Sequence, residues 1–66
     1  MTIQLNGEPC DVIRATTVAA LLDELQLSPL ALLIEHNGLA LLRDEWPSAQ
    51  LADGDRIEVL RVVAGG

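Results

Sequence analysis

The chain lacks lysine, phenylalanine and tyrosine, and it has only one cysteine, one histidine and one tryptophan. Without lysine there is no internal ε-amine, which excludes chains of this protein linked to one another through lysine side chains. A single cysteine cannot close a disulfide, and the sequence has no Cys/His cluster for a structural metal. Stability must therefore come from apolar packing, for which half of the residues are hydrophobic.

Positive charge is also scarce, because four arginines stand against ten aspartates and glutamates, for a formal charge of −6. This balance argues against binding to DNA or RNA and against an anionic membrane surface. It favours association with a basic protein surface. Residues 1–5 lack the basic start of a secretory signal, and no apolar run approaches membrane-spanning length. Together with the lone cysteine, these features predict a cytoplasmic protein.

The length of 66 residues predicts a single domain over residues 1–66. Residues 2–5 alternate polar and apolar, which predicts a first strand. Asn6-Gly7 is a strong hairpin signal, so residues 8–13 should return as a second strand. Pro9 has no N–H and should lie near the start of that strand or on an unpaired edge. Cys10 is interpreted as a small buried hydrophobic residue.

A helix is predicted next, because apolar residues follow a pair of threonines at helical spacing. Thr16-Thr17 offers hydroxyl groups for the N-cap, and Ser28-Pro29 should end the helix because the residue before proline avoids helical angles. One apolar stripe at positions i, i+3, i+4 and i+7 consists of Val18, Leu21, Leu22 and Leu25. Such a stripe covers one face of a sheet.

The second half of the chain predicts three more strands. Residues 30–35 form a near-continuous apolar run, typical of a central strand, and residues 39–42 form a short fourth strand. The turn between them contains His36, interpreted as a solvated turn residue. An irregular connector over residues 43–47 should place Trp46 at one end of the core, with its indole N–H reaching solvent or a carbonyl.

The last predicted strand, residues 56–63, follows a turn at 53–55. It alternates, so Ile57 and Val59 should face the helix while Glu58 and Leu60 face outward. The order strand, strand, helix, strand, short strand, strand predicts an α+β fold with a mixed sheet and one helix packed on one face. This is the β-grasp, or ubiquitin-like, arrangement, in which the last strand leaves the sheet centre as a tail.

Several segments resemble ThiS, the thiamine-biosynthesis sulfur carrier family, in order and spacing along the whole chain. They are residues 5–9 (LNGEP), 17–22 (TVAALL), 34–38 (IEHNG), 43–46 (RDEW), 51–59 (LADGDRIEV) and the Gly65-Gly66 end. The chain departs from the family at Ala64, where a third glycine is common. It also departs at residues 39–42, where the family often has a glutamate first and a proline last.

The resemblance implies that this chain is a sulfur carrier and not an enzyme. The Gly66 carboxylate would be adenylated by a ubiquitin-activating-type adenylyltransferase, and sulfur from a cysteine desulfurase persulfide would then replace AMP. The resulting thiocarboxylate would donate its sulfur to thiazole synthase. ATP and magnesium would belong to the activating partner, and this chain would bind no cofactor or metal.

The tail of this carrier would comprise Ala64, Gly65 and Gly66. Glycine has no Cβ, so this end of the chain can thread a narrow cleft in a partner. The body would dock through the sheet face turned away from the helix. That face should carry apolar side chains rimmed by charge, and the residues expected to bind the partner are Leu33, Glu35, Glu58, Leu60 and Val62.

Three other functions remain open from the sequence. The small subunit of molybdopterin synthase, or another ubiquitin-like sulfur carrier, would share the fold and the Gly-Gly end. A ubiquitin-like modifier would instead form an amide with a target lysine. A non-catalytic β-grasp interaction module would have an inert tail, so deletion of Gly65-Gly66 would change nothing.

Overall fold

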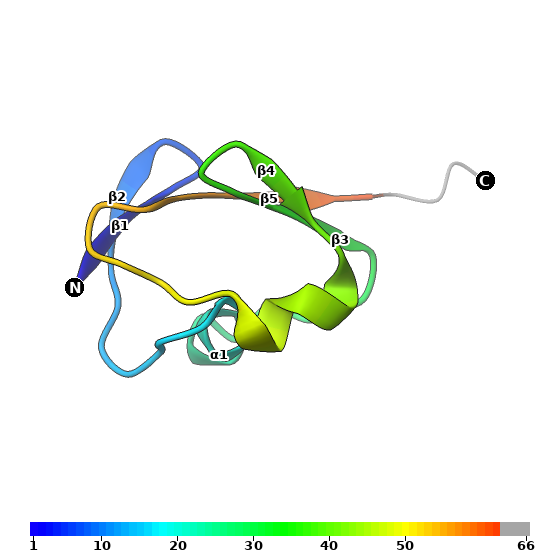
Figure 1. The fold of residues 1–66 in the computed structure, drawn as a ribbon, viewed down its shortest axis with the longest axis horizontal. Coiled ribbons are helices and arrows are strands. Elements are labelled where there is room, and N and C mark those ends of the chain that lie inside the picture. Colours follow the sequence, from blue (N-terminus) through cyan, green and yellow to red (C-terminus); the bar gives the residue numbers. More distant parts are fainter. Residues whose placement is uncertain (63–66) are drawn as a thin grey trace.

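The computed structural model describes residues 1–62, which form one five-stranded sheet with an α-helix and a 3₁₀ helix on the same side of it (Figure 1). The elements are β1 (Thr2–Leu5), β2 (Glu8–Asp11), α1 (Val18–Glu24), β3 (Leu32–His36), β4 (Leu39–Leu41), the 3₁₀ helix η1 (Arg43–Ser48) and β5 (Arg56–Arg61). The strand order is β2-β1-β5-β3-β4. Strands β1 and β5 are parallel, and all other pairs are antiparallel. The predicted α+β, β-grasp fold is confirmed.

The first hairpin forms as predicted, although its second strand is shorter. Asn6 and Gly7 have φ angles of 50° and 83°, the left-handed conformation that a tight hairpin turn requires. Strand β2 ends at Asp11 instead of residue 13, yet Val12 is buried and its N–H donates to the Met1 carbonyl at 2.7 Å. Pro9 lies on this outermost strand, where its missing N–H breaks no ladder bond.

Helix α1 begins where predicted and ends earlier. The Thr17 hydroxyl caps the first turn by accepting the Ala20 N–H at 3.1 Å. The prediction that Ser28-Pro29 ends the helix is wrong, because Gln26 adopts a φ of 58° and turns the backbone away. The Leu27 N–H then donates to the Leu22 carbonyl at 2.9 Å, which is the long-range bond of a Schellman C-cap.

The hydrophobic core lies between the sheet and the two helices. It includes Ile57 of β5, which is fully buried. The other buried members are Ile3, Val12, Ala15, Val18, Leu21, Leu22, Leu32, Ile34 and Trp46. Every residue of the predicted helical stripe is buried or packed against this core, while Cys10 is half-buried at its edge.

Trp46 is buried more deeply than predicted. The connector around it is a regular 3₁₀ helix that contacts α1, which presses the indole into the core. Its Nε1–H reaches neither solvent nor any acceptor among residues 1–62, so the prediction of an exposed or bonded N–H is wrong. The Arg43 guanidinium lies over the ring, 5.3 Å from its centroid, a cation–π arrangement.

Strand β3 begins at Leu32, two residues later than predicted, because Ala31 takes a left-handed φ of 61°. It lies between β5 and β4, so its interior position is confirmed. Strand β5 is the middle strand and is described as far as Arg61; the predicted last residue, Val63, lies outside the described residues. Within residues 1–62, no helix has the length and apolar character needed to cross a membrane.

The left-handed C-cap at Gln26 gives a stability prediction. A residue with a Cβ is strained at positive φ, so Gln26→Gly should raise the free energy of unfolding by about 1 kcal/mol. Thermal unfolding should shift upward by several degrees, roughly 4–8 °C for a domain of this size. Gln26→Ala, which keeps the Cβ, is the matched control. Equal melting temperatures for the two variants would contradict this account.

Candidate functional site

The sheet face turned away from the helices carries a short apolar patch. Along β3 the side chains alternate, so Leu32 and Ile34 are buried while Leu33 is 55% exposed. Leu33 lies directly opposite Leu60 of β5, which is 53% exposed. Val62 follows two positions after Leu60 and is 47% exposed. The structure therefore brings together the three apolar residues that the sequence nominated for partner binding.

Leu42 extends this patch and was not among the predicted residues. The β3–β4 register pairs Ile34 with Leu41, so one step further along the ladder Leu42 lies beside Leu33. Its side chain is 69% exposed. Alternation within residues 39–42 would have placed it on the outer face, but its neighbour across the strands depends on the register. We call Leu33, Leu42, Leu60 and Val62 the outer patch.

Two glutamates border the outer patch. Glu35 and Glu58 lie directly opposite each other on β3 and β5, one step along the outer face from Leu33 and Leu60. Cβ atoms of such opposed residues are about 5 Å apart, and like charges in this arrangement are destabilising. In the described part of the chain the only ion pair is between His36 and Asp55, so neither glutamate has a cationic partner there.

The last described hydrogen bond before the tail lies next to the outer patch. The Val62 N–H donates to the Ala31 carbonyl at 2.7 Å. Ala31 holds this carbonyl in place from its left-handed conformation, which is uncommon for a residue with a Cβ. This bond extends the contact between the β3 and β5 segments one residue beyond Arg61. The predicted tail residues, Ala64, Gly65 and Gly66, lie outside the described residues.

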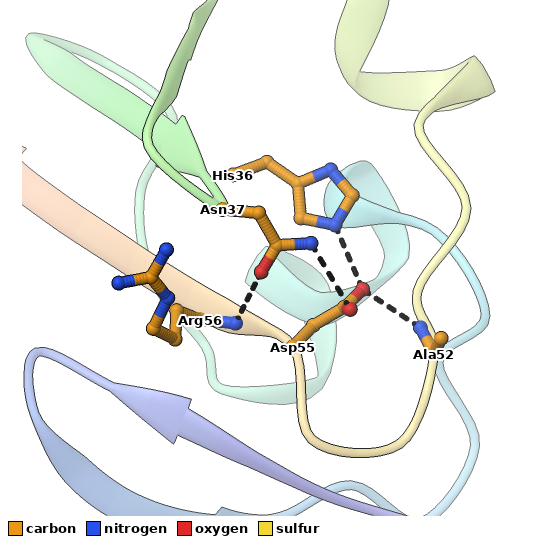
Figure 2. Close-up of polar contacts among 5 residues, drawn as sticks. All are labelled: His36, Asn37, Ala52, Asp55 and Arg56. Atoms are coloured by element: carbon orange, nitrogen blue, oxygen red, sulfur yellow. Dashed lines mark hydrogen bonds and ion pairs between the residues drawn. The ribbon is translucent and has the colours of Figure 1, made fainter.

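The prediction that His36 is only a solvated turn residue is wrong. Its side chain is 19% exposed, and its Nε2 lies 2.8 Å from the Asp55 Oδ2 (Figure 2). The Asp55 carboxylate also accepts the Ala52 N–H at 2.8 Å and the Asn37 amide at 3.1 Å. The Asn37 Oδ1 in turn accepts the Arg56 N–H at 2.8 Å. This network ties the β3–β4 turn to the start of β5.

The electrostatics of this network favour a charged Asp55. Burial alone would raise the pKa of its carboxyl group, but the hydrogen bonds from His36, Ala52 and Asn37 outweigh that effect and hold the pKa below its ordinary value. The network lies at the start of β5, at the opposite end of the strand from Val62. We therefore assign it a role in stabilising the fold and none in the chemistry of the tail.

Glu24 is a second carboxylate with a structural role. It accepts the backbone N–H groups of Ile13, Arg14 and Ala15 at 2.7 to 2.8 Å. These three bonds lower the pKa of Glu24, and the bond from Ile13 contributes most to the lowering. They hold the loop after β2 against the last turn of α1 and give each of those N–H groups a hydrogen-bond acceptor.

No cluster of three or more metal-ligating side chains occurs within residues 1–62. The described residues offer an exposed apolar patch with an acidic border at the end of β5. An apolar patch rimmed by charge is typical of a protein-binding surface.

Comparisons with known proteins identify the family. The model of the ThiS family matches residues 3–66. The chain belongs to the ThiS family. The crystal structure of the thiamine biosynthesis protein ThiS from Geobacter metallireducens is 32% identical, aligns over the whole of both chains and has a TM-score of 0.86. An NMR structure of a thiamine biosynthesis protein from the same organism, also 32% identical, has a TM-score of 0.80 and aligns over all of this chain and 88% of its own.

Curated relatives of this ThiS-family chain differ in length. A thiazole synthase from Magnetococcus marinus is 35% identical over 66 residues, and the chain spans only 20% of its length. The uncharacterised protein ycf40 of Pyropia yezoensis is 32% identical, and the match covers 93% of it. Family membership makes the chain a sulfur carrier of thiamine biosynthesis rather than an enzyme, as predicted.

The Asp55 network predicts a specific loss of stability. Because the pKa of Asp55 is lowered in the folded protein, its charged form stabilises the fold above the ordinary pKa of an aspartate. This contribution disappears as the pH falls through the lowered, folded-state pKa. Asp55→Asn should cost about 2 kcal/mol near neutral pH, the scale of lost charge-assisted hydrogen bonds. The difference in melting temperature between wild type and Asp55→Asn should shrink steadily as the pH is lowered below the ordinary pKa of an aspartate.

Asp44→Asn is the control for this experiment, since the Asp44 side chain makes no hydrogen bond with residues 1–62. A melting-temperature difference between wild type and Asp55→Asn that stays constant with pH would show that the carboxylate charge is not what stabilises the network.

Proposed function

We propose that this ThiS-family chain carries sulfur as a thiocarboxylate on Gly66 and donates it to a thiazole synthase. The observation that carries this proposal is the family match, which extends to residue 66 and so includes the Gly65-Gly66 end. The fold supports it, because β5, the middle strand of the sheet, is the last element before these glycines in the chain (Figure 1).

The proposed chemistry begins with activation of a poor electrophile. A carboxylate is unreactive at neutral pH, so a ubiquitin-activating-type adenylyltransferase would use ATP and magnesium to convert Gly66 to an acyl adenylate, with release of pyrophosphate. The terminal sulfur of a persulfide from a cysteine desulfurase would then displace AMP. A thiol would then cleave the S–S bond of this acyl disulfide, which releases the thiocarboxylate and leaves the thiol joined to the desulfurase cysteine as a disulfide. Such thiol chemistry requires a reducing compartment, so we propose a cytoplasmic location.

The contribution of this chain would be positioning. Binding the body to an enzyme makes delivery of the tail effectively intramolecular, which can replace a large part of the entropic barrier. Four residues separate Val62 from Gly66, and an extended chain of that length spans at most about 14 Å. An enzyme that acts on Gly66 would therefore contact the sheet close to Val62.

We propose the outer patch as that contact surface, with Glu35 and Glu58 as its charged border. The patch consists of half-exposed or exposed aliphatic side chains next to the strand end. The two opposed carboxylates lack a cation among residues 1–62, so an arginine or lysine of a basic partner surface would relieve their repulsion. This arrangement also agrees with the net charge of −6.

The thiazole synthase of Magnetococcus marinus supports the proposed acceptor. A stretch similar to this entire chain makes up a fifth of that protein. A carrier-like segment and a thiazole synthase thus occur within one polypeptide, as expected if the two act on the same sulfur atom.

The first test is the intact mass of the protein after incubation with ATP, magnesium, the adenylyltransferase and desulfurase of the same organism, and cysteine. We expect a gain equal to the replacement of one oxygen by sulfur. Deletion of Gly66 should abolish the gain while leaving the thermal unfolding unchanged. If wild type gains no mass although both enzymes act on a control carrier, an interaction module with an inert tail becomes the better interpretation.

The second test addresses docking. Leu60→Ala should raise the KM for the carrier in ATP–pyrophosphate exchange about tenfold, since truncation of a central interface residue typically costs 1–2 kcal/mol. Leu39→Ala is the control, because Leu39 is also an exposed leucine but lies on β4 outside the outer patch. Equal KM values for the two variants would exclude the outer patch as the docking surface.

A further inference from the structure

The end of β5 has a neighbouring strand on only one side. Its parallel pairing with β1 covers Arg56 and Ile57, whose partners are Gln4 and Leu5. Its antiparallel pairing with β3 continues to Arg61. Figure 1 shows β5 running on past the β1–β2 hairpin toward the C-terminus. Beyond Ile57, therefore, no strand among residues 1–62 pairs with the side of β5 that faces β1.

The hydrogen bonds show which backbone groups face this open side. In an antiparallel pair, alternate residues direct their N–H and C=O groups toward the same neighbour. The Val62 N–H donates to Ala31, at the start of β3, so Leu60 and Val62 face β3. The intervening residue, Arg61, therefore directs its N–H and C=O away from β3.

Asn6, the residue after β1, makes the last hydrogen bonds between the β1 segment and β5. Its backbone N–H donates to the Ile57 carbonyl at 2.9 Å, and its Oδ1 accepts the Val59 N–H at 2.8 Å. The Asn6 side chain thus takes the place of one further strand residue. In the part of the chain that the structure describes, no residue accepts the next donor on this side, the Arg61 N–H.

The two outermost strands of the sheet carry features that discourage pairing with a strand of another protein, and the end of β5 does not. Strand β2 carries Pro9 together with two acidic residues, and β4 is only three residues long. Both are devices that discourage addition of a further strand. The end of β5 instead carries the half-exposed Leu60 and Val62 and no acidic residue after Glu58.

We propose that the adenylyltransferase adds an extended segment of its own beside Val59 and Arg61, on the side that β1 leaves open. This inference rests on the proposed function, because it specifies how the enzyme that activates Gly66 holds the strand leading to it. Addition of a strand binds through main-chain hydrogen bonds and holds the paired chain extended. Because Gly66 is at most about 14 Å from Val62, the enzyme surface that receives Gly66 lies within reach of this edge.

The mutational test is Arg61→Pro in carrier-dependent ATP–pyrophosphate exchange. Proline removes the Arg61 N–H and places its ring on the open side, whereas the bonds from β5 to β3 remain. We expect the KM for the carrier to rise about tenfold or more, as for loss of one or two backbone hydrogen bonds together with a clash. Arg61→Ala keeps the N–H and should stay within about threefold of wild type. Wild-type kinetics for Arg61→Pro would overturn the inference.

Amide hydrogen exchange of the wild-type protein tests the same contact without a mutation, which decides the case if Arg61→Pro fails to fold. The Arg61 amide should exchange rapidly in the free protein and at least about tenfold more slowly in the complex with the adenylyltransferase. The Val62 amide, bonded to Ala31, serves as the reference that is protected in both. An Arg61 amide left unprotected in a complex that adenylates the carrier overturns this inference alone. Absence of adenylation overturns the proposed function as well.

Discussion

The central position of β5 is the constraint on which the rest of the structure depends. This strand pairs with β1 on one side and with β3 on the other, and its Ile57 lies fully buried in the core. The strand that precedes the tail is thus held by β1 and β3 over its first residues and by β3 alone at its end. A reactive group can be positioned only as well as the strand that presents it, so this pairing matters for a carrier.

The small size of the domain explains why several polar side chains hold loops in place through hydrogen bonds. A chain of this length buries only about 60% of its unfolded surface, so loops must be held by hydrogen bonds as well as by apolar contacts. Glu24 binds three backbone N–H groups of the loop after β2. Asp55 joins the β3–β4 turn to the start of β5. Both lie away from the outer patch, which leaves that face available for a partner.

Much of the fold followed from local pattern, and the errors have identifiable physical causes. Asn6-Gly7 and the leucine stripe predicted the first hairpin and α1, because both signals are contained within a few residues. The end of α1 was misplaced because Gln26 accepts a left-handed angle that its side chain does not favour. His36 was misjudged because its partner, Asp55, is 19 residues away. The burial of the Trp46 side chain depends on how η1 packs against α1, and no short sequence pattern predicts that packing.

By itself, the sequence determined the composition of the core, the alternation that places Leu33 and Leu60 on the outer face, and the family resemblance that ends in Gly65-Gly66. These properties depend on residue type and short spacing, which a linear chain displays directly. Only the tertiary structure decided that Leu42 joins the outer patch, that Glu35 opposes Glu58, and that β1 ends before β5 does. Each of these depends on strand register, which is set when distant segments pack together and bury their apolar faces in common.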